Sequence, residues 1–128
     1  MEAYGEAICE IEYAGTWHSA VDLAAHLSRS FIVITACNPM SVRLPAHENE
    51  ERTAELAALV GPQALRSVGR SADNTWHEPG FAVAPSDKAL EIAAHFGQAA
   101  VYLVGPEGRS TIEIPEPPVV PIGEGQLP

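Results

Sequence analysis

The clearest feature of the chain is an uninterrupted apolar run at residues 31–36 (FIVITA), which is rich in β-branched side chains. A second continuous run follows at residues 99–104 (AAVYLV). Runs of this kind are typical of strands that are covered on both faces. Residues 7–13 (AICEIEY) alternate between apolar and polar positions, which predicts a strand with one buried face. Further strands are predicted at residues 65–71, 81–84 and 111–114, the last pairing back on 99–104 as a hairpin.

Three segments are predicted to form helices. The clearest is residues 48–60 (ENEERTAELAALV), where three glutamates suit the positive end of the helix dipole and a Gly-Pro pair ends the pattern. In residues 86–97, Ser86 is a natural N-cap and Gly97 fits the position that follows the last helical turn. Residues 19–28 predict a shorter third helix.

The order of these elements from residue 31 onward predicts a single α+β domain. Strand, helix, strand, strand, helix and strand match the split β-α-β-β-α-β (ferredoxin-like) arrangement, with a C-terminal hairpin strand added. We therefore expect a mixed, mainly antiparallel sheet with two helices on one face. The 128 residues suffice for one domain, which we place at residues 1–114. Residues 115–128 are rich in proline and glycine and predict an extended or disordered tail.

The composition is that of an ordinary globular protein, with 46% hydrophobic and 19% charged residues. The formal net charge is −10, from 17 acidic and 7 basic residues, so the surface should repel phosphate backbones and anionic lipids. No apolar run approaches the roughly 20 residues that span a bilayer. The first residues, MEAYGEAICE, lack the pattern of a signal peptide. We therefore expect a cytoplasmic protein with neither nucleic acid nor a membrane as its partner.

No standard motif for a cofactor, a metal or a hydrolase is present. The sequence has no GxGxxG, Walker loop or GxSxG pattern, and its five histidines are not spaced like zinc ligands. We therefore expect neither a cofactor nor a metal. The two cysteines, Cys9 and Cys37, are expected to be free thiols. Cys37 follows an apolar strand, which favours a buried, inert thiol over a nucleophile.

Two polar residues share the apolar stripe of the helix at residues 48–60. Leu56, Leu59 and Val60 define that stripe, and helical spacing places Asn49 and Arg52 on the same face. A guanidinium on a core-facing stripe must be paired or must reach a wet pocket. The sequence leaves both interpretations open: Arg52 is either a structural bridge or a ligand-binding residue.

Asn38 and Gln98 stand at the junctions of the two buried strands. Asn38 follows the first of them, where an Asx-turn is its ordinary use. It could instead point its amide toward Asn49 and Arg52, since the connection from 38 to 49 is short. Gln98 follows Gly97, where a polar side chain often satisfies helix carbonyls. A ligand-binding role for Gln98 is the alternative.

The segment WHEPGF, residues 76–81, is the second place where polar residues interrupt the pattern. Pro79 favours an edge strand or a bulge there. Glu78 could be a general base, an ion-pair partner of Arg52, or a solvated carboxylate. In the strict split topology we expect the two central strands to run parallel, which would place Glu78 and Asn38 at opposite ends of the sheet.

Four segments, ITACNP, HENEERTAEL, WHEPGFAV and HFGQAAVYLV, in this order and spacing, resemble a bacterial family catalogued as domain of unknown function 3293. The resemblance covers residues 30–104. It implies a small bacterial cytoplasmic protein and supplies no activity. One departure is Cys37, where a larger side chain such as Trp is expected. The positions that match the family's pattern are Thr35, Asn38, Pro39, Asn49, Arg52, Glu78, Phe81, Gly97 and Gln98.

Two functional hypotheses follow. In the first, the protein binds a small anionic ligand that bears a carboxylate or phosphate. Arg52 would hold the anion and Glu78 is the candidate catalytic acid or base. In the second, the polar residues only rigidify the fold, and a sheet face or edge serves an interaction or regulatory module that acts as a homodimer. The first hypothesis places the ligand-binding residues at Thr35, Asn38, Asn49, Arg52 and Gln98.

Overall fold

The structure, a computed structural model, describes residues 7–38 and 42–114. The seven strands form one sheet in the order β2-β1-β4-β5-β3-β6-β7, and every neighbouring pair is antiparallel. In chain order the elements are β1 (Ile8–Tyr13), β2 (Thr16–Ser19), α1 (Ala20–Leu27), β3 (Phe31–Thr35), α2 (Ala46–Val60), β4 (Leu65–Arg70), β5 (His77–Val83), α3 (Asp87–His95), β6 (Ala100–Gly105) and β7 (Gly108–Glu113).

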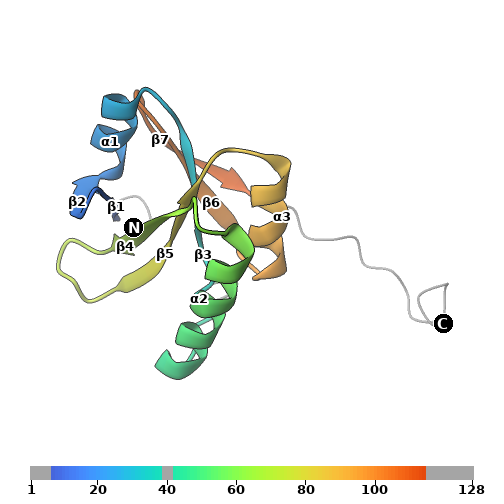
Figure 1. Ribbon diagram of the computed structural model, residues 1–128. Helices are drawn as coiled ribbons and strands as arrows, with labels where there is room; N and C mark the ends of the chain where they lie inside the picture. Colours follow the sequence, from blue (N-terminus) through green and yellow to red (C-terminus); the bar gives the residue numbers. More distant parts are fainter. Residues whose placement is uncertain (1–6, 39–41, 115–128) are drawn as a thin grey trace.

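The sheet is curled into a half-barrel, and its two faces are covered differently (Figure 1). Helices α2 and α3 pack against one face, which we call the outer face, and α1 packs against the other, the inner face. Side chains along a strand point alternately to opposite faces. In β3, Ile32 and Ile34 therefore belong to the outer core, while Phe31 and Val33 belong to the inner one.

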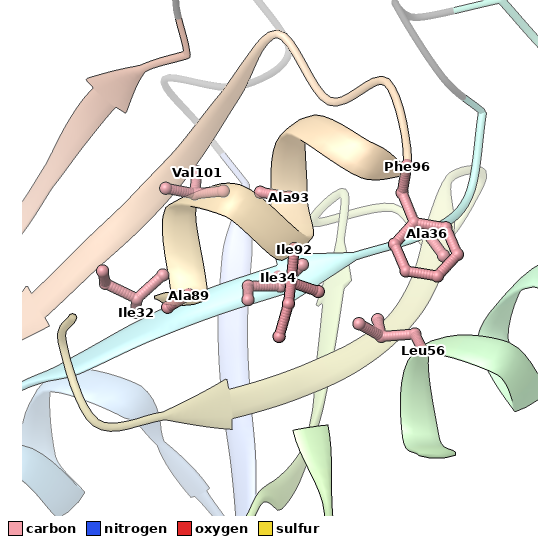
Figure 2. Close-up of a cluster of buried hydrophobic side chains, with 9 residues drawn as sticks. All are labelled: Ile32, Ile34, Ala36, Leu56, Ala89, Ile92, Ala93, Phe96 and Val101. Atoms are coloured by element: carbon pink, nitrogen blue, oxygen red, sulfur yellow. The ribbon is translucent and has the colours of Figure 1, made fainter. Parts of the chain in front are cut away.

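The side chains of the outer core are almost completely buried. Leu56 of α2 and Ile34 of β3 are fully buried, and Phe96, just after α3, is 2% exposed. Figure 2 shows these three side chains converging between the two helices and the strand. Burying large apolar side chains in this way removes them from water and fixes α2 and α3 on the sheet.

The inner core occupies only one end of the half-barrel. Leu23 and Ala24 of α1 pack there against Ile11, Phe31 and other side chains of the inner face. Helix α1 begins at the N-cap Ser19, whose hydroxyl accepts a hydrogen bond from Asp22 N at 3.3 Å. Since α1 has only eight residues, it leaves the rest of the inner face without a helix.

The α+β class and the mainly antiparallel sheet are confirmed, but the ferredoxin-like arrangement is not. The sheet is wholly antiparallel rather than mixed, and it is larger than that arrangement because the hairpin β1–β2 joins it through β4. Helices α2 and α3 do share one face, whereas α1 lies on the other. The predicted tail at residues 115–128 lies outside the described residues. None of the described helices has the length and apolar character needed to cross a membrane.

Strand β2 is absent from the sequence prediction. It pairs with β1 through a two-residue turn in which Ala14 and Gly15 both have positive φ, at 52° and 82°. Hairpins of this kind usually carry Asn-Gly or Asp-Gly at these positions, so Ala14 concealed the turn. β2 has only four residues, which is too short to show the alternation of apolar and polar positions that is typical of a strand.

Two expectations about apolar positions are wrong. Leu59 is 47% exposed, whereas Leu56 is fully buried and Val60 is partly buried against the outer core. Pro79 marks neither an edge strand nor a bulge, since β5 lies between β4 and β3 and pairs with β4 in unbroken register. A proline inside a central strand lacks an N–H for the ladder. The ladder between β3 and β5 ends at the Thr35–Gly80 pair, so Pro79 pairs with β4 alone. Its carbonyl accepts a hydrogen bond from the Thr35 hydroxyl at 3.0 Å.

Candidate functional site

The part of the inner face that α1 leaves uncovered forms a cavity of about 180 Å³. Six of the seven strands contribute to its wall, which places it inside the curl of the sheet. The surface of the cavity is mainly apolar. Several polar groups lie together near the end of β3 and the start of β5. The lining residues are Cys9, Val33, Thr35, Asn38, Ser67, Gly69, Trp76, Glu78, Gly80, Gln98, Ala99, Ala100, Val101, Tyr102 and Thr111.

Asn38 is the centre of the polar end of this cavity. It has a left-handed backbone with φ of 49°, a conformation that asparagine tolerates better than most residues. Its side-chain oxygen accepts hydrogen bonds from Leu44 N at 2.9 Å and from Asn49 Nδ2 at 3.0 Å. Its own backbone N–H donates to Asn49 Oδ1 at 3.0 Å. These bonds join the end of β3 to the first turns of α2.

Glu78 forms a hydrogen bond with the side-chain amide nitrogen of Asn38. Nδ2 of Asn38 donates to Glu78 Oε2 at 2.7 Å. The expectation that these residues lie at opposite ends of the sheet is wrong, because β3 and β5 run antiparallel and the end of one meets the start of the other. Burial raises the pKa of the Glu78 carboxyl, and hydrogen bonds from the Asn38 and Trp76 side chains oppose that rise.

Thr35 and Gln98 also line the cavity and hold the same segment of chain. The Thr35 hydroxyl, besides donating to Pro79, accepts a hydrogen bond from Cys37 N at 3.1 Å. Gln98 Nε2 donates to the Cys37 carbonyl at 3.1 Å. Both side chains are therefore partly engaged with backbone, and each still borders the cavity.

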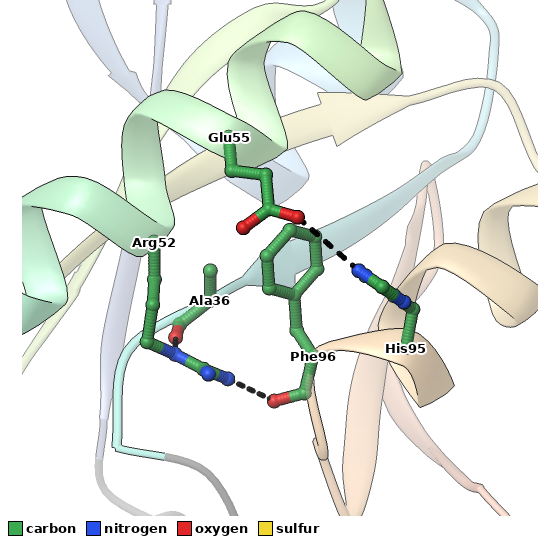
Figure 3. A network of polar contacts seen from close by, with 5 residues as sticks. All are labelled: Ala36, Arg52, Glu55, His95 and Phe96. Carbon is green, nitrogen blue, oxygen red and sulfur yellow. Dashed lines mark hydrogen bonds and ion pairs between the residues drawn. The ribbon is translucent and has the colours of Figure 1, made fainter.

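Arg52 lies on the outer side of this segment and does not line the cavity. Its Nε donates to the Ala36 carbonyl at 2.6 Å, and its Nη2 donates to the Phe96 carbonyl. Figure 3 shows the guanidinium between these two carbonyls, with the His95–Glu55 ion pair nearby. No ion pair joins Arg52 and Glu78, both of which the structure describes. Arg52 thus ties α3 and the end of β3 to α2.

The structure therefore brings together most of the predicted residues but divides them in two. Thr35, Asn38, Glu78 and Gln98 border the cavity. Asn49 and Arg52 instead support the chain that carries them.

Both cysteines are buried free thiols, as expected. Cys37 contacts Thr53 and Pro79 rather than the cavity. Cys9 lines the cavity, and burial raises the pKa of its thiol to about 11, although the Arg109 charge lowers it. A thiol with this pKa is protonated near neutral pH and is a poor nucleophile.

Tyr102, Trp76 and Ser67 are among the cavity residues that the sequence analysis did not assign to a site. Tyr102 lies in a continuous apolar run, where alternation cannot tell which side chains face a cavity. Trp76 closes the turn before β5, where its N–H donates to the Ser71 hydroxyl at 3.0 Å. Ser67 is 3% exposed and is the one polar residue among the fully buried described residues. A serine among the apolar positions of β4 was the available signal.

Comparison with known proteins supports the resemblance and adds no activity. No curated protein and no solved structure matches the chain significantly. A model of a family described as proteins of unknown function, DUF3293, matches residues 34–101, which is more than half of the 128 residues. The match runs from β3 to β6 and includes every residue of the polar end of the cavity. The chain therefore belongs to the DUF3293 family.

Proposed function

We propose that the inner cavity binds a small organic molecule that presents a basic or hydrogen-bond-donating group to Glu78. One observation carries the proposal. Glu78 is a partly buried carboxyl that lines the cavity, and its described side-chain partners, Asn38 and Trp76, are neutral. A carboxylate removed from water without a positive partner is unfavourable, so a ligand that donates to it would be stabilised.

The size and lining of the cavity limit the ligand. About 180 Å³ is below the roughly 300–1,000 Å³ of sites for drug-sized molecules, so we infer a small metabolite. Tyr102, Trp76 and Val33 offer apolar surface for its body. Thr35 and Gln98 lie beside Glu78 and would orient its polar groups.

The anionic ligand that the sequence predicted at Arg52 has less support. Two backbone carbonyls already occupy the guanidinium, and none of the described residues that line the cavity carries a positive charge. Glu78 has the raised pKa that suits a general acid or base. Cys9, the one thiol among the described residues that line the cavity, is protonated near neutral pH and is therefore a poor nucleophile. We therefore propose binding ahead of turnover.

The alternative, a homodimeric interaction module, and the cytoplasmic location remain predictions. Trp17 on the edge strand β2 is 40% exposed, which makes it the side chain that would serve such a contact. The mass of the protein in solution and its dependence on Trp17→Ser would test it.

The binding proposal is tested by titration calorimetry with n-pentylamine as a minimal basic probe. We expect the wild type to bind the amine, and Glu78→Gln to reduce the affinity by roughly tenfold or more, since a charge-assisted hydrogen bond contributes about 1.5–3 kcal/mol. Glu91→Gln, which changes an exposed carboxyl on α3, is the matched control and should bind as the wild type does. Equal affinity of the wild type and Glu78→Gln would refute the role of Glu78.

A further inference from the structure

A second charged residue, on the edge strand β7, lies against one wall residue of the cavity without lining the cavity itself. Arg109 belongs to β7, two residues before Thr111, so the two side chains share the inner face of that strand. The Arg109 guanidinium carbon lies 4.6 Å from the centre of the Tyr102 ring, which is part of the cavity wall. Its Nη1 donates to the Ala7 carbonyl at 2.8 Å, next to β1.

Arg109 thus crosses the open side of the half-barrel and lies at the rim of the cavity. Arg109 and Ala7 line a shallow depression that also contains Cys9, and Cys9 is a wall residue of the cavity itself. The Arg109 charge also acts on Cys9, where it lowers the thiol pKa against the effect of burial. The two hollows therefore share Cys9 as a lining residue, and Arg109 lines the second of them.

The sheet register relates this rim to Glu78. Gly69 pairs with Glu78 on one side and with Cys9 on the other. Neighbouring strands are about 4.8 Å apart, so the backbones of Cys9 and Glu78 are separated by roughly 10 Å at the same level of the sheet. Glu78 is therefore a wall residue of the cavity, and Arg109 lies outside the wall, against the ring of the wall residue Tyr102.

We propose that the ligand carries an acidic group as well as a basic one, and that Arg109 binds the acidic group while Glu78 binds the basic one. This inference rests on the proposed function of the cavity. The ligand class is an amino-carboxylate with a short apolar body between its charges. The Ala7 carbonyl uses one of the five N–H donors of Arg109, and the guanidinium fork suits a carboxylate.

The test compares three sets of probes in titration calorimetry: linear ω-amino acids from 4-aminobutanoate to 6-aminohexanoate, n-alkylamines, and n-alkanoates of matched length. We expect at least one amino acid to bind the wild type roughly tenfold more tightly than its amine. Arg109→Gln should remove that difference and leave amine binding unchanged. Arg109→Lys should restore part of it, because the charge remains and the fork does not.

The outcomes separate this inference from the proposed function. If the amines bind through Glu78 and the added carboxylate gives no gain, the role of Arg109 is refuted while the proposed function stands. Loss of amine binding in Arg109→Gln would make Arg109 a support of the fold and also refute its role. If neither amines nor amino acids bind the wild type, both the proposed function and this inference fail.

Discussion

The two faces of strand β3 show how one sheet can carry a dry core and a cavity together. On the outer face, Ile32 and Ile34 are covered by two helices and are at most 2% exposed. On the inner face, Val33 and Thr35 border the cavity because α1 is too short to reach them. The difference arises from helix coverage alone, since both faces alternate along the same five residues.

Two arginines, one on each side of the sheet, differ in their contacts in the same way as the two faces. Arg52 meets the Ala36 and Phe96 carbonyls on the outer side, where little space remains. Arg109 meets one carbonyl and an aromatic ring on the inner side, beside a cavity. The Arg52 contacts hold the fold together, whereas a ligand-binding role for Arg109 is our proposal.

The largest expected effect tests the outer core. Leu56→Ala removes a fully buried side chain from between α2, α3 and β3. We expect the free energy of unfolding to fall by about 2–5 kcal/mol, because burial is lost and a void remains. Leu59→Ala is the matched control in the same helix and should change it by less than roughly 0.5 kcal/mol, since Leu59 is 47% exposed. Urea unfolding measures both, and similar losses would contradict the dry outer core.

The second prediction concerns Arg52. Arg52→Ala should lower the free energy of unfolding by roughly 2–4 kcal/mol, because each buried carbonyl left without a partner costs about 1–3 kcal/mol. Arg66→Ala, at a side chain that is 67% exposed, should change it by less than about 1 kcal/mol. At a temperature where it remains folded, Arg52→Ala should bind n-pentylamine as tightly as the wild type. A selective loss of binding with normal stability would return Arg52 to the ligand site.

The third prediction compares two glycines on the inner face. A Cβ at Gly80 would lie 2.2 Å from the Ile34 carbonyl oxygen, whereas one at Gly69 would make ordinary contacts with Trp76 at 3.6 Å. Gly80→Ala should therefore destabilise the protein by about 1–3 kcal/mol through overpacking. Gly69→Ala should leave stability nearly unchanged, and thermal unfolding distinguishes the two. Equal stability of both variants would show that β3 and β5 can separate at Gly80.

The sequence predicted the elements with strong periodicity and a defined start. Ser86 is the N-cap of α3, and its hydroxyl accepts a hydrogen bond from Ala89 N at 3.1 Å. Gly97 follows α3 with a positive φ of 73°, as its position predicted. Helix α2 begins two residues before the predicted start because its N-cap, Pro45, has no side-chain acceptor to mark it. Local signals therefore located helix starts where a side chain makes the cap, and helix ends where a glycine follows the last turn.

The polar site was predictable as a set of residues but not as a geometry. Asn38, Asn49 and Glu78 interrupt apolar patterns, and they do form hydrogen bonds with one another. Which face of the sheet Arg52 reaches depends on how α2 docks, which no local pattern records. Arg109 of β7 donates to the Ala7 carbonyl beside β1, a long-range contact that residue spacing cannot supply.

The smallest expected effect is the pH dependence that Glu78 gives to stability. Its pKa in the folded protein is raised above the ordinary value of 4.5, mainly by burial. Between these two values the folded state binds more protons than the unfolded state, so the free energy of unfolding falls as the pH rises through this window. Glu78→Gln cannot titrate and should show a flatter profile from pH 4 to pH 8 in urea unfolding.

The exposed carboxyl of Glu91 again supplies the control, since Glu91→Gln should keep the wild-type profile. Binding of n-pentylamine is a second test of the ionisation of the Glu78 carboxyl. A bound ammonium favours the ionised carboxyl, so saturating amine should stabilise the wild type more at pH 8 than at pH 4 and leave Glu78→Gln nearly unaffected. The free energy of unfolding of the wild type and of Glu78→Gln could instead change in parallel with pH, both with and without amine. In that case Glu78 neither gives the inner face its pH dependence nor binds the amine.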